Sequence, residues 1–188
     1  MKRIIYLLIL LLCLPTLTNC SNNNMENIVE ISPSTLFEGE LKKIEPHLDL
    51  LTGCVEVSYK GNKKNFRAIY ELWEKGKVTE EYDGISFKGI EDSFDSDISV
   101  SAKRLENDKY RLKLIVENAM TTEKFDLPIN LNYNAINLNK QIKTQDDKEI
   151  IIWGLAGTKV NDGFISYSNI EKTLEVAEAA LVLKIKFE

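Results

Sequence analysis

The stretch DISVSAKRLENDKYRLKLIVEN, at positions 97–118, decides the fold that we predict for this chain. Apolar residues recur at every second position on both sides of a polar centre. These positions are Ile98, Val100, Ala102, Tyr110, Leu112, Leu114 and Val116. Alternation with a period of two is typical of strands that have one buried face and one wet face. Because Asn107-Asp108 in the centre favours a turn, the stretch predicts an antiparallel hairpin.

The same pattern recurs in NFRAIYELWEKGKVTEEYDG, at positions 65–84. It predicts a second hairpin that turns at Glu74–Lys77, with Gly76 at a positive φ. Phe66 and Tyr70 then share a buried face, and Trp73 lies on the opposite face.

The segment ALVLKIKFE, at positions 180–188, predicts a final strand with Leu183 in the core. Five less regular strands are predicted, near residues 53–60, 84–90, 123–131, 148–153 and 163–167. Pro128 suits the edge of a sheet, because proline has no N–H to donate.

Two short helices complete the prediction. Ser168 and Glu171 have the spacing of a capping box, and they open a helix that places Ile170, Leu174 and Ala177 on one face. A second short helix is expected around residues 34–44. Eight to ten short strands without long intervening helices predict an all-β fold, an antiparallel β-sandwich, for which an immunoglobulin-like arrangement is one form.

The N-terminus, MKRIIYLLILLLCLPTLTNC, has the parts of an export signal. Lys2 and Arg3 precede an apolar run over residues 4–14, and this run is shorter than the roughly 20 residues that cross a bilayer as a helix. Leu17-Thr18-Asn19 does not supply the small residues of an ordinary signal-peptidase site.

Leu17-Thr18-Asn19-Cys20 resembles the lipobox of bacterial lipoproteins, although that family usually has Gly, Ala or Ser where this chain has Asn19. The resemblance covers residues 1–20 alone. It implies cleavage before Cys20 and a diacylglyceryl group on the Cys20 sulfur. Two acyl chains suffice for stable anchoring, so the membrane is an expected partner, on the extracytoplasmic side of the cell. Plain secretion and an uncut anchor are the alternatives.

The expected organisation is a signal peptide over residues 1–19, a lipidated Cys20 with a flexible tether over residues 20–35, and one sandwich domain over residues 36–188. We expect the folded part of the chain to begin somewhere between Ile28 and Leu36, near the end of this tether. The formal net charge of −5 becomes −7 once Lys2 and Arg3 are removed with the leader. This acidic balance argues against nucleic acid as a partner.

Cys54 and His47 offer little for catalysis. Cys54 would be the one cysteine left beside a lipidated Cys20, and its strand-like surroundings predict a small core residue. The chain has one histidine, His47, and neither a catalytic triad nor a usual zinc site forms from it without further partners.

The densest acidic cluster is IEDSFDSDIS, with Glu91, Asp92, Asp95 and Asp97. Calcium binds several carboxylates on a loop, so these four residues are the candidate calcium ligands. The spacing differs from that of an EF-hand loop, and we expect a solvated acidic loop and no cofactor. We also expect Asp95→Ala to leave the melting temperature equal in calcium and in chelator.

Three further features were weighed for chemistry. Glu80 and Glu81 cannot act as one carboxylate pair, because neighbours on a strand point to opposite faces. Gly154 to Lys159 lacks the order of a phosphate-binding loop, and Gly154 is read as the end of a buried strand. Trp73 and Trp153 are the candidate contacts for a partner, since tryptophan combines an apolar ring with an N–H donor, and a core role is the alternative for Trp153.

These observations predict a membrane-anchored envelope lipoprotein that acts as a binding or interaction module, with an envelope protein or a glycan as its partner. A structural or accessory subunit of an envelope complex is the alternative. A small hydrolase with an unrecognised site is a third hypothesis, and we predict no enzyme.

Overall fold

The computed structural model describes residues 27–106, 109–159 and 169–188. One group of strands consists of β1 (Ile28–Ser34), β2 (Leu51–Lys60), β5 (Ser93–Arg104), β6 (Tyr110–Val116), β7 (Ala119–Phe125) and β9 (Ile142–Gln145). A second group consists of β3 (Asn65–Glu74), β4 (Lys77–Lys88), β8 (Leu131–Asn137), β10 (Ile150–Lys159) and β11 (Ala179–Phe187). The helical elements are the 3-10 helices η2 (Gly39–Lys43) and η3 (Glu45–His47) and the α-helix α2 (Ile170–Val176).

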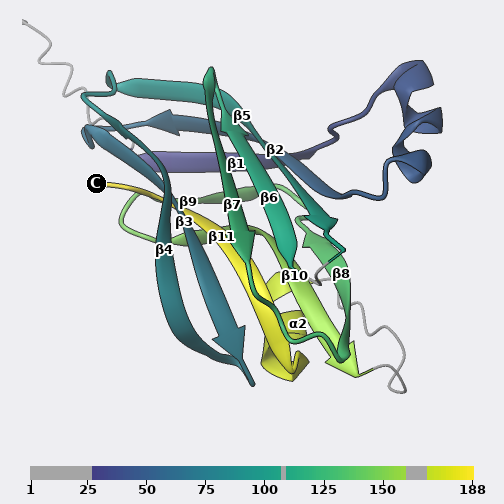
Figure 1. Cartoon of the computed structure of the whole chain (residues 1–188). Coiled ribbons are helices and arrows are strands. Elements are labelled where there is room, and N and C mark those ends of the chain that lie inside the picture. The colour runs from purple at the N-terminus through teal and green to yellow at the C-terminus, as the bar shows by residue number, and fades with distance from the viewer. Residues whose placement is uncertain (1–26, 107–108, 160–168) are drawn as a thin grey trace, which may run out of the picture.

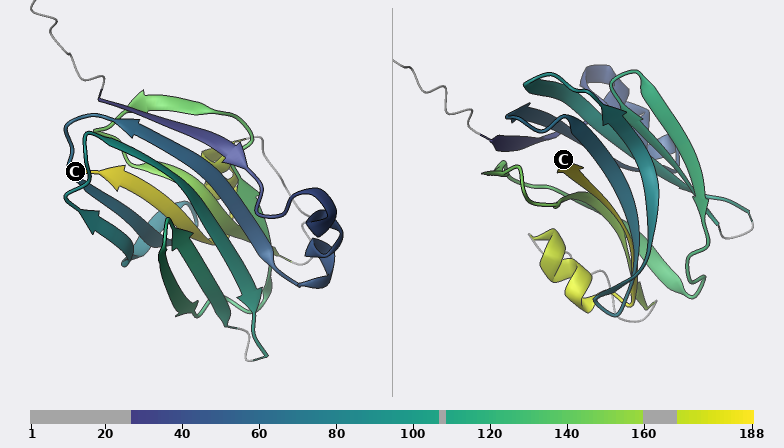
Figure 2. Two further views of the ribbon diagram at one scale, coloured as in Figure 1. Left: turned by 90° about the horizontal axis from the view of Figure 1, so that it is seen from above. Right: turned by 90° about the vertical axis from the view of Figure 1, so that its left-hand side faces the viewer.

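The two groups form two antiparallel sheets that pack face to face (Figure 1, Figure 2). In the described residues the first sheet has six strands in the order β7-β6-β5-β2-β1-β9, and the second has five in the order β4-β3-β11-β10-β8. The predicted all-β sandwich is therefore confirmed. The immunoglobulin form is not the one observed, because immunoglobulin domains divide seven to nine strands differently between their sheets.

The hairpin predicted from residues 97–118 is present as β5 and β6. Val100 lies opposite Leu114, and Ala102 lies opposite Leu112. All seven apolar positions of the pattern are buried, and the residues between them face outward. The β3–β4 hairpin is confirmed as well. Lys75 and Gly76 have φ values of 48° and 75°, the backbone that a tight two-residue turn requires.

The core lies between the sheets and is rich in aromatic rings. Phe66 stacks on Phe94 with a centroid distance of 4.9 Å, and Tyr59 stacks on Phe187 at 4.2 Å. Leu183 is fully buried, as predicted for the final strand. Ring pairs of this kind stabilise a core by about 0.5–1.5 kcal/mol beyond the burial of their area.

Helix α2 covers part of the outer face of the five-stranded sheet (Figure 2). Ile170, Leu174 and Ala177 are buried on one side of it, as predicted. Its N-cap is Asn169, whose Oδ1 accepts a hydrogen bond from the Lys172 N–H at 3.2 Å. The helix expected near residues 34–44 is replaced by η2 and η3, which follow one another in a segment that projects from one end of the sandwich (Figure 1).

The folded domain begins earlier than the predicted tether allows. Strand β1 lies between β2 and β9 in the sheet, so the part of residues 20–35 that follows Ile28 is not a tether. Val29 and Ile31 are fully buried. Their alternation spans too few residues to stand out in the sequence, and the pairing on both sides makes it a strand.

Two strand boundaries were also wrong. The strand predicted over residues 123–131 is instead the end of β7, a connection that contains Pro128, and the start of β8. Proline has no N–H for a ladder, which explains why pairing stops there. The separate strands predicted on either side of Asp83 form one strand, β4, which passes through Gly84.

Strand β10 does not end at Gly154, as the sequence suggested, but continues to Lys159. The glycines allow close packing rather than a turn. A Cβ on Gly157 would lie 2.6 Å from a ring carbon of Tyr133, and one on Gly154 would lie 3.2 Å from Ile136. The leader with Cys20, the turn at Asn107-Asp108, the strand predicted over residues 163–167 and the cap Ser168 lie outside the described residues.

Candidate functional site

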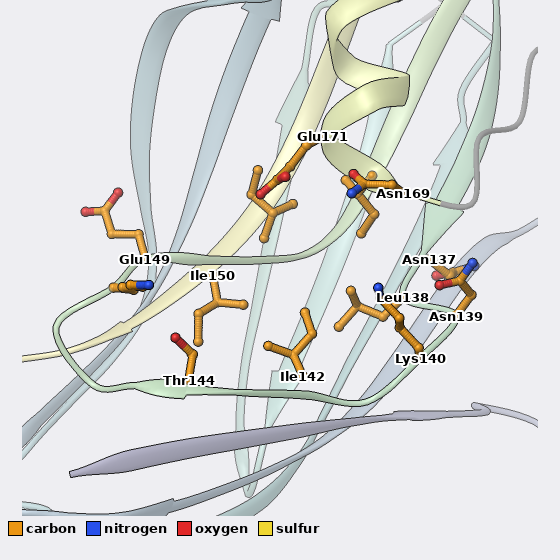
Figure 3. Close-up of a pocket in the computed structure, with 13 residues that line it drawn as sticks. Asn137, Leu138, Asn139, Lys140, Ile142, Thr144, Glu149, Ile150, Asn169 and Glu171 are labelled. Atoms are coloured by element: carbon orange, nitrogen blue, oxygen red, sulfur yellow. The ribbon is translucent and has the colours of Figure 1, made fainter.

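A pocket of about 330 Å³ opens where the two sheets separate beside α2 (Figure 3). Three parts of the chain form it: the connection from β8 into β9, the turn from β9 into β10, and the first residues of α2. The lining residues are Asn137, Leu138, Asn139, Lys140, Ile142, Thr144, Lys148, Glu149, Ile150, Ile151, Asn169, Ile170 and Glu171.

The topology explains why a hollow forms there. The chain leaves the five-stranded sheet at the end of β8, pairs β9 with β1 in the other sheet, and returns as β10. Helix α2 packs on the outer face of the five-stranded sheet and does not extend over β9. The space between β9 and the start of α2 is therefore enclosed on several sides and open on one.

The pocket has apolar walls. Ile142 and Ile150 project into the hollow from its two β-strands (Figure 3). Ile150 and Ile170 are buried, whereas Leu138, Ile142 and Ile151 are half-buried. A volume near the lower end of the range for ligand sites, with apolar walls and a few polar groups, is the form that small-molecule sites usually take.

The rim is polar, and its charges are not equivalent. Glu149 points away from the hollow (Figure 3) and accepts a hydrogen bond from Lys184 Nζ at 2.7 Å. Lys186 Nζ lies 3.7 Å from the other oxygen of Glu149. The hydrogen bond from Lys184 and the charges of both lysines lower the pKa of Glu149, so this carboxylate is already neutralised by protein cations.

Lys184 is the centre of a charged cluster on the outer face of the five-stranded sheet. Its ammonium group also donates to Glu71, and to Glu81 at 3.3 Å. The side chains of Lys184 and Glu71 are each 7% exposed. Burial alone would lower the pKa of Lys184, but the hydrogen bonds to Glu149 and Glu71 outweigh it and raise the pKa above its usual value. This cluster supports the wall that carries Glu149.

A second hollow, of about 440 Å³, lies between β4 and β7. Acidic residues dominate it: Glu80, Asp83, Glu123 and Asp126. Asp83 pairs with Arg67, and Asp126 pairs with Lys109 at 2.8 Å. The hollow beside α2 is the better candidate, because it combines a larger set of apolar side chains with rim charges that have no partner among the described residues.

The four candidate calcium ligands do not surround a common point. Asp92 pairs with Lys64, whereas Asp95 and Asp97 lie within β5 on its solvent side, opposite Ser58 and Glu56. In the ranges that the structure describes, no three His, Cys, Asp or Glu side chains are placed to hold a metal ion.

The two tryptophans, the candidate contacts for a partner, differ in how far they are buried. Trp153 is 1% exposed and packs over Gly53, where an added Cβ would lie 2.1 Å from a ring carbon. Trp153 therefore has the core role that was the alternative to a partner contact, because β10 continues past this residue instead of ending in a loop. Trp73 lies half-buried on the outer face, and its indole N–H donates to Glu71 at 3.0 Å.

Cys54 is half-buried on the outer face of β2, not in the core as predicted. The register places Val55 and Val57 inside, which leaves Cys54 on the other face, and burial raises the pKa of its thiol. His47 lies in η3, away from the pocket. Glu80 and Glu81 behave as predicted: Glu81 reaches Lys184 on the outer face, while Glu80 lines the acidic hollow.

Sequence reasoning missed the pocket. Its residues come from the segments around positions 137–151 and 169–171, which no single motif unites. The asparagine-rich run LNYNAINLNK, at positions 131–140, was the one local signal, because asparagine suits loops and strand ends.

Comparisons of this chain with protein-family models, with curated proteins and with solved structures found no match. Among the described residues, no helix is long and apolar enough to cross a bilayer.

Proposed function

We propose that the protein is a lipid-anchored binding module of the bacterial envelope, and that its ligand occupies the pocket beside α2. One observation carries the proposal: the pocket combines apolar walls with rim groups that have no partner in the described chain. His47 and Cys54, the side chains best suited to nucleophilic chemistry, lie elsewhere. The site therefore favours binding over catalysis.

The anchor part of the proposal rests on the leader and on the start of β1. Cys20 would carry the lipid, and Ile28 begins the first strand. Residues 20–27 would reach at most about 27 Å, at about 3.4 Å per extended residue. The sandwich would thus stay close to the membrane surface.

The anchor is tested by the intact mass of the protein extracted with detergent from envelope membranes. We expect a species that starts at Cys20 and is heavier by a diacylglyceryl group. An unmodified cysteine, or a retained leader, would refute the lipid anchor.

The pocket is tested by a thermal-shift screen of small envelope metabolites against the native protein and Thr144→Trp. Thr144 lines the pocket from an edge strand, so the indole would fill the hollow. Thr122→Trp, at an exposed position of β7, is the matched control. We expect ligands that raise the melting temperature of the native protein and the control but not of Thr144→Trp. If no ligand distinguishes Thr144→Trp from the control, the pocket is not the site.

An accessory subunit of an envelope complex is the second candidate, and one surface favours it. The segment from residue 35 to 50, which we call the arm, holds η2 and η3, and neither contains a buried residue. Leu41 and Ile44 are 55% and 49% exposed, and Leu36 is also exposed. Apolar side chains gathered on a projection often mark a protein interface.

A photo-cross-linker at position 41, installed in cells, tests this alternative. A single discrete cross-linked partner, which is lost when the cross-linker is moved to exposed position 113 on β6, would support an accessory role. Cross-links of equal yield and pattern at both positions would refute it.

A further inference from the structure

We propose, on the basis of the pocket function above, that the ligand is a small zwitterion with an apolar side chain. Free apolar amino acids and apolar dipeptides share this chemistry: one ammonium group, one carboxylate and an apolar branch. Three properties of the pocket lead to this class, namely its free charges, their placement and its size.

The free charges have both signs. Lys140 and Lys148 line the pocket, as does Glu171, and none of the three forms an ion pair or hydrogen bond within the described chain. Glu149, the fourth charge on the rim, is bound by Lys184 and Lys186 and is not available. The pocket thus offers two cations for a carboxylate and one carboxylate for an ammonium group.

The placement separates these charges across the apolar walls. Glu171 extends from the start of α2 on one side of the hollow, and Lys140 extends from the β8–β9 connection on another (Figure 3). Ile142 and Ile150 project into the same hollow from β9 and β10 (Figure 3). A zwitterion whose ammonium group and carboxylate point in different directions could contact both sides while its apolar side chain contacts the isoleucines.

The size limits the ligand. A cavity of about 150 Å³ holds one benzene ring. The pocket has about 330 Å³, which is room for one or two aliphatic side chains with their charged groups but not for a long acyl chain. Thr144 adds a hydroxyl group that suits the remaining amide or carboxylate atoms, whereas the Asn137 amide already donates to the Thr52 carbonyl oxygen at 3.2 Å.

The test is isothermal titration of the full chain, purified in detergent, with leucine and with leucyl-leucine, which separates the two sources of this chemistry. N-acetylleucine, which lacks the ammonium group, and leucinamide, which lacks the carboxylate, are the matched analogues. Glycine lacks the apolar branch. We expect leucine or leucyl-leucine to bind at least about 10-fold more tightly than each analogue, which corresponds to about 1.4 kcal/mol.

Two substitutions assign the charges. Glu171→Gln should weaken leucine binding about 10-fold while leaving the weaker binding of N-acetylleucine unchanged. Lys140→Gln should weaken the binding of leucine and leave the affinity for leucinamide unchanged, because leucinamide has no carboxylate for Lys140 to contact. Glu175→Gln, one turn further along α2 and exposed, and Lys113→Gln, on β6, are the controls that should bind like the native protein.

The outcomes separate this inference from the proposal on which it rests. If Thr144→Trp blocks ligands from the metabolite screen but neither leucine nor leucyl-leucine binds, the zwitterion class is wrong and the pocket function stands. Equal loss of binding for leucine and N-acetylleucine in Glu171→Gln would also overturn it, because the ammonium contact would then be absent. If no ligand depends on Thr144, both proposals fail.

Discussion

The core between the sheets and the pocket beside α2 are lined by the same kinds of aliphatic residue, yet they differ in completeness. In the core, the side chains of both sheets fill the space, and residues such as Leu183 are fully buried. In the pocket, Ile142 and Ile151 remain half-buried, and the rim carries charged groups that have no partner within residues 27–106, 109–159 and 169–188. The difference shows where the protein uses apolar surface for stability and where it leaves such surface for another molecule.

The charged groups differ between the two regions in the same way. On the outer face of the five-stranded sheet, Lys184 and Glu71 are buried and fully engaged with each other and their neighbours. At the pocket, Lys140 and Glu171 are exposed, and neither has a partner in the part of the chain that the structure describes. Substitutions in the core and the buried cluster should therefore affect folding, whereas those at the rim should affect binding.

The largest effect is expected for Leu183→Asp. This change places a carboxylate without a partner in the centre of the core, which carries a very large desolvation penalty. We expect the variant to fail to fold, seen as loss of the cooperative transition in circular dichroism. A soluble variant with a cooperative transition would show that the core is not as closely packed as the structure indicates.

Lys184→Met should destabilise the fold by about 3 kcal/mol, because Glu71 would then be a buried charge without its cation. The double variant with Glu71→Leu removes both charges and should recover most of that loss. Urea denaturation of the three proteins measures the difference. Equal stability of the single and double variants would mean that Glu71 is not buried.

Tyr59→Phe tests a buried hydrogen bond near the turn from β9 into β10. The Tyr59 hydroxyl donates to Asp146 at 3.0 Å and accepts from the Lys63 N–H at 2.7 Å. Asp146 is itself buried. Loss of the hydroxyl leaves that carboxylate without a donor, and we expect a loss of about 2 kcal/mol at pH 8 in urea denaturation.

The same variant has a pH signature. Burial raises the pKa of Tyr59 to about 12, above the value of about 10 in an unfolded chain. Between these two pH values the unfolded tyrosine ionises and the folded one does not, so the native protein loses stability as pH rises from 10 to 12. Tyr59→Phe has no tyrosine hydroxyl to ionise at this position and so lacks this loss. The difference in unfolding free energy between the native protein and Tyr59→Phe should therefore shrink between pH 8 and pH 11. A difference in unfolding free energy that stays constant over this pH range would contradict the raised pKa of Tyr59.

The smallest effect on stability is expected for Asn169→Ala. Its side chain caps α2, and loss of such a cap costs about 1 kcal/mol. Asn169→Asp should retain the cap and serve as the control for stability alone, because Asn169 also lines the pocket. Because α2 carries Glu171 to the pocket, we expect the alanine variant to weaken ligand binding more than its stability loss alone predicts. If Asn169→Ala were as stable as the native protein in thermal denaturation, the Asn169 side chain would not stabilise α2 as a cap.

The strands could be predicted from the sequence where the alternation of apolar and polar residues extends over many positions. Residues 98–116 and 181–187 alternate over enough positions that a single register buries the alternating apolar side chains, and the structure confirms both. The same reasoning missed β1 and β9, because a strand of a few residues between polar neighbours carries too little pattern. Both become strands through pairing with partners that are far away in the sequence.

Glycine and tryptophan depend on distant neighbours for a related reason. The sequence predicts that the buried strand ends at Gly154, but Gly154 and Gly157 both lie inside β10, where Ile136 and Tyr133 leave no room for a side chain. Trp153, for which the sequence leaves a partner contact and a core role open, is buried over Gly53. In each case the neighbour that decides the role belongs to another strand.

The sequence by itself determined the fold class, the main hairpins and the buried face of the final strand, because these depend on local alternation between apolar and polar residues. Only the tertiary structure decided the strand order, the buried ion cluster around Lys184 and the pocket beside α2. The pocket joins residues from β8, β9, β10 and α2 that are apart in the chain. Their proximity depends on how two sheets diverge around one short helix, which is a property of the packed molecule and of no single segment.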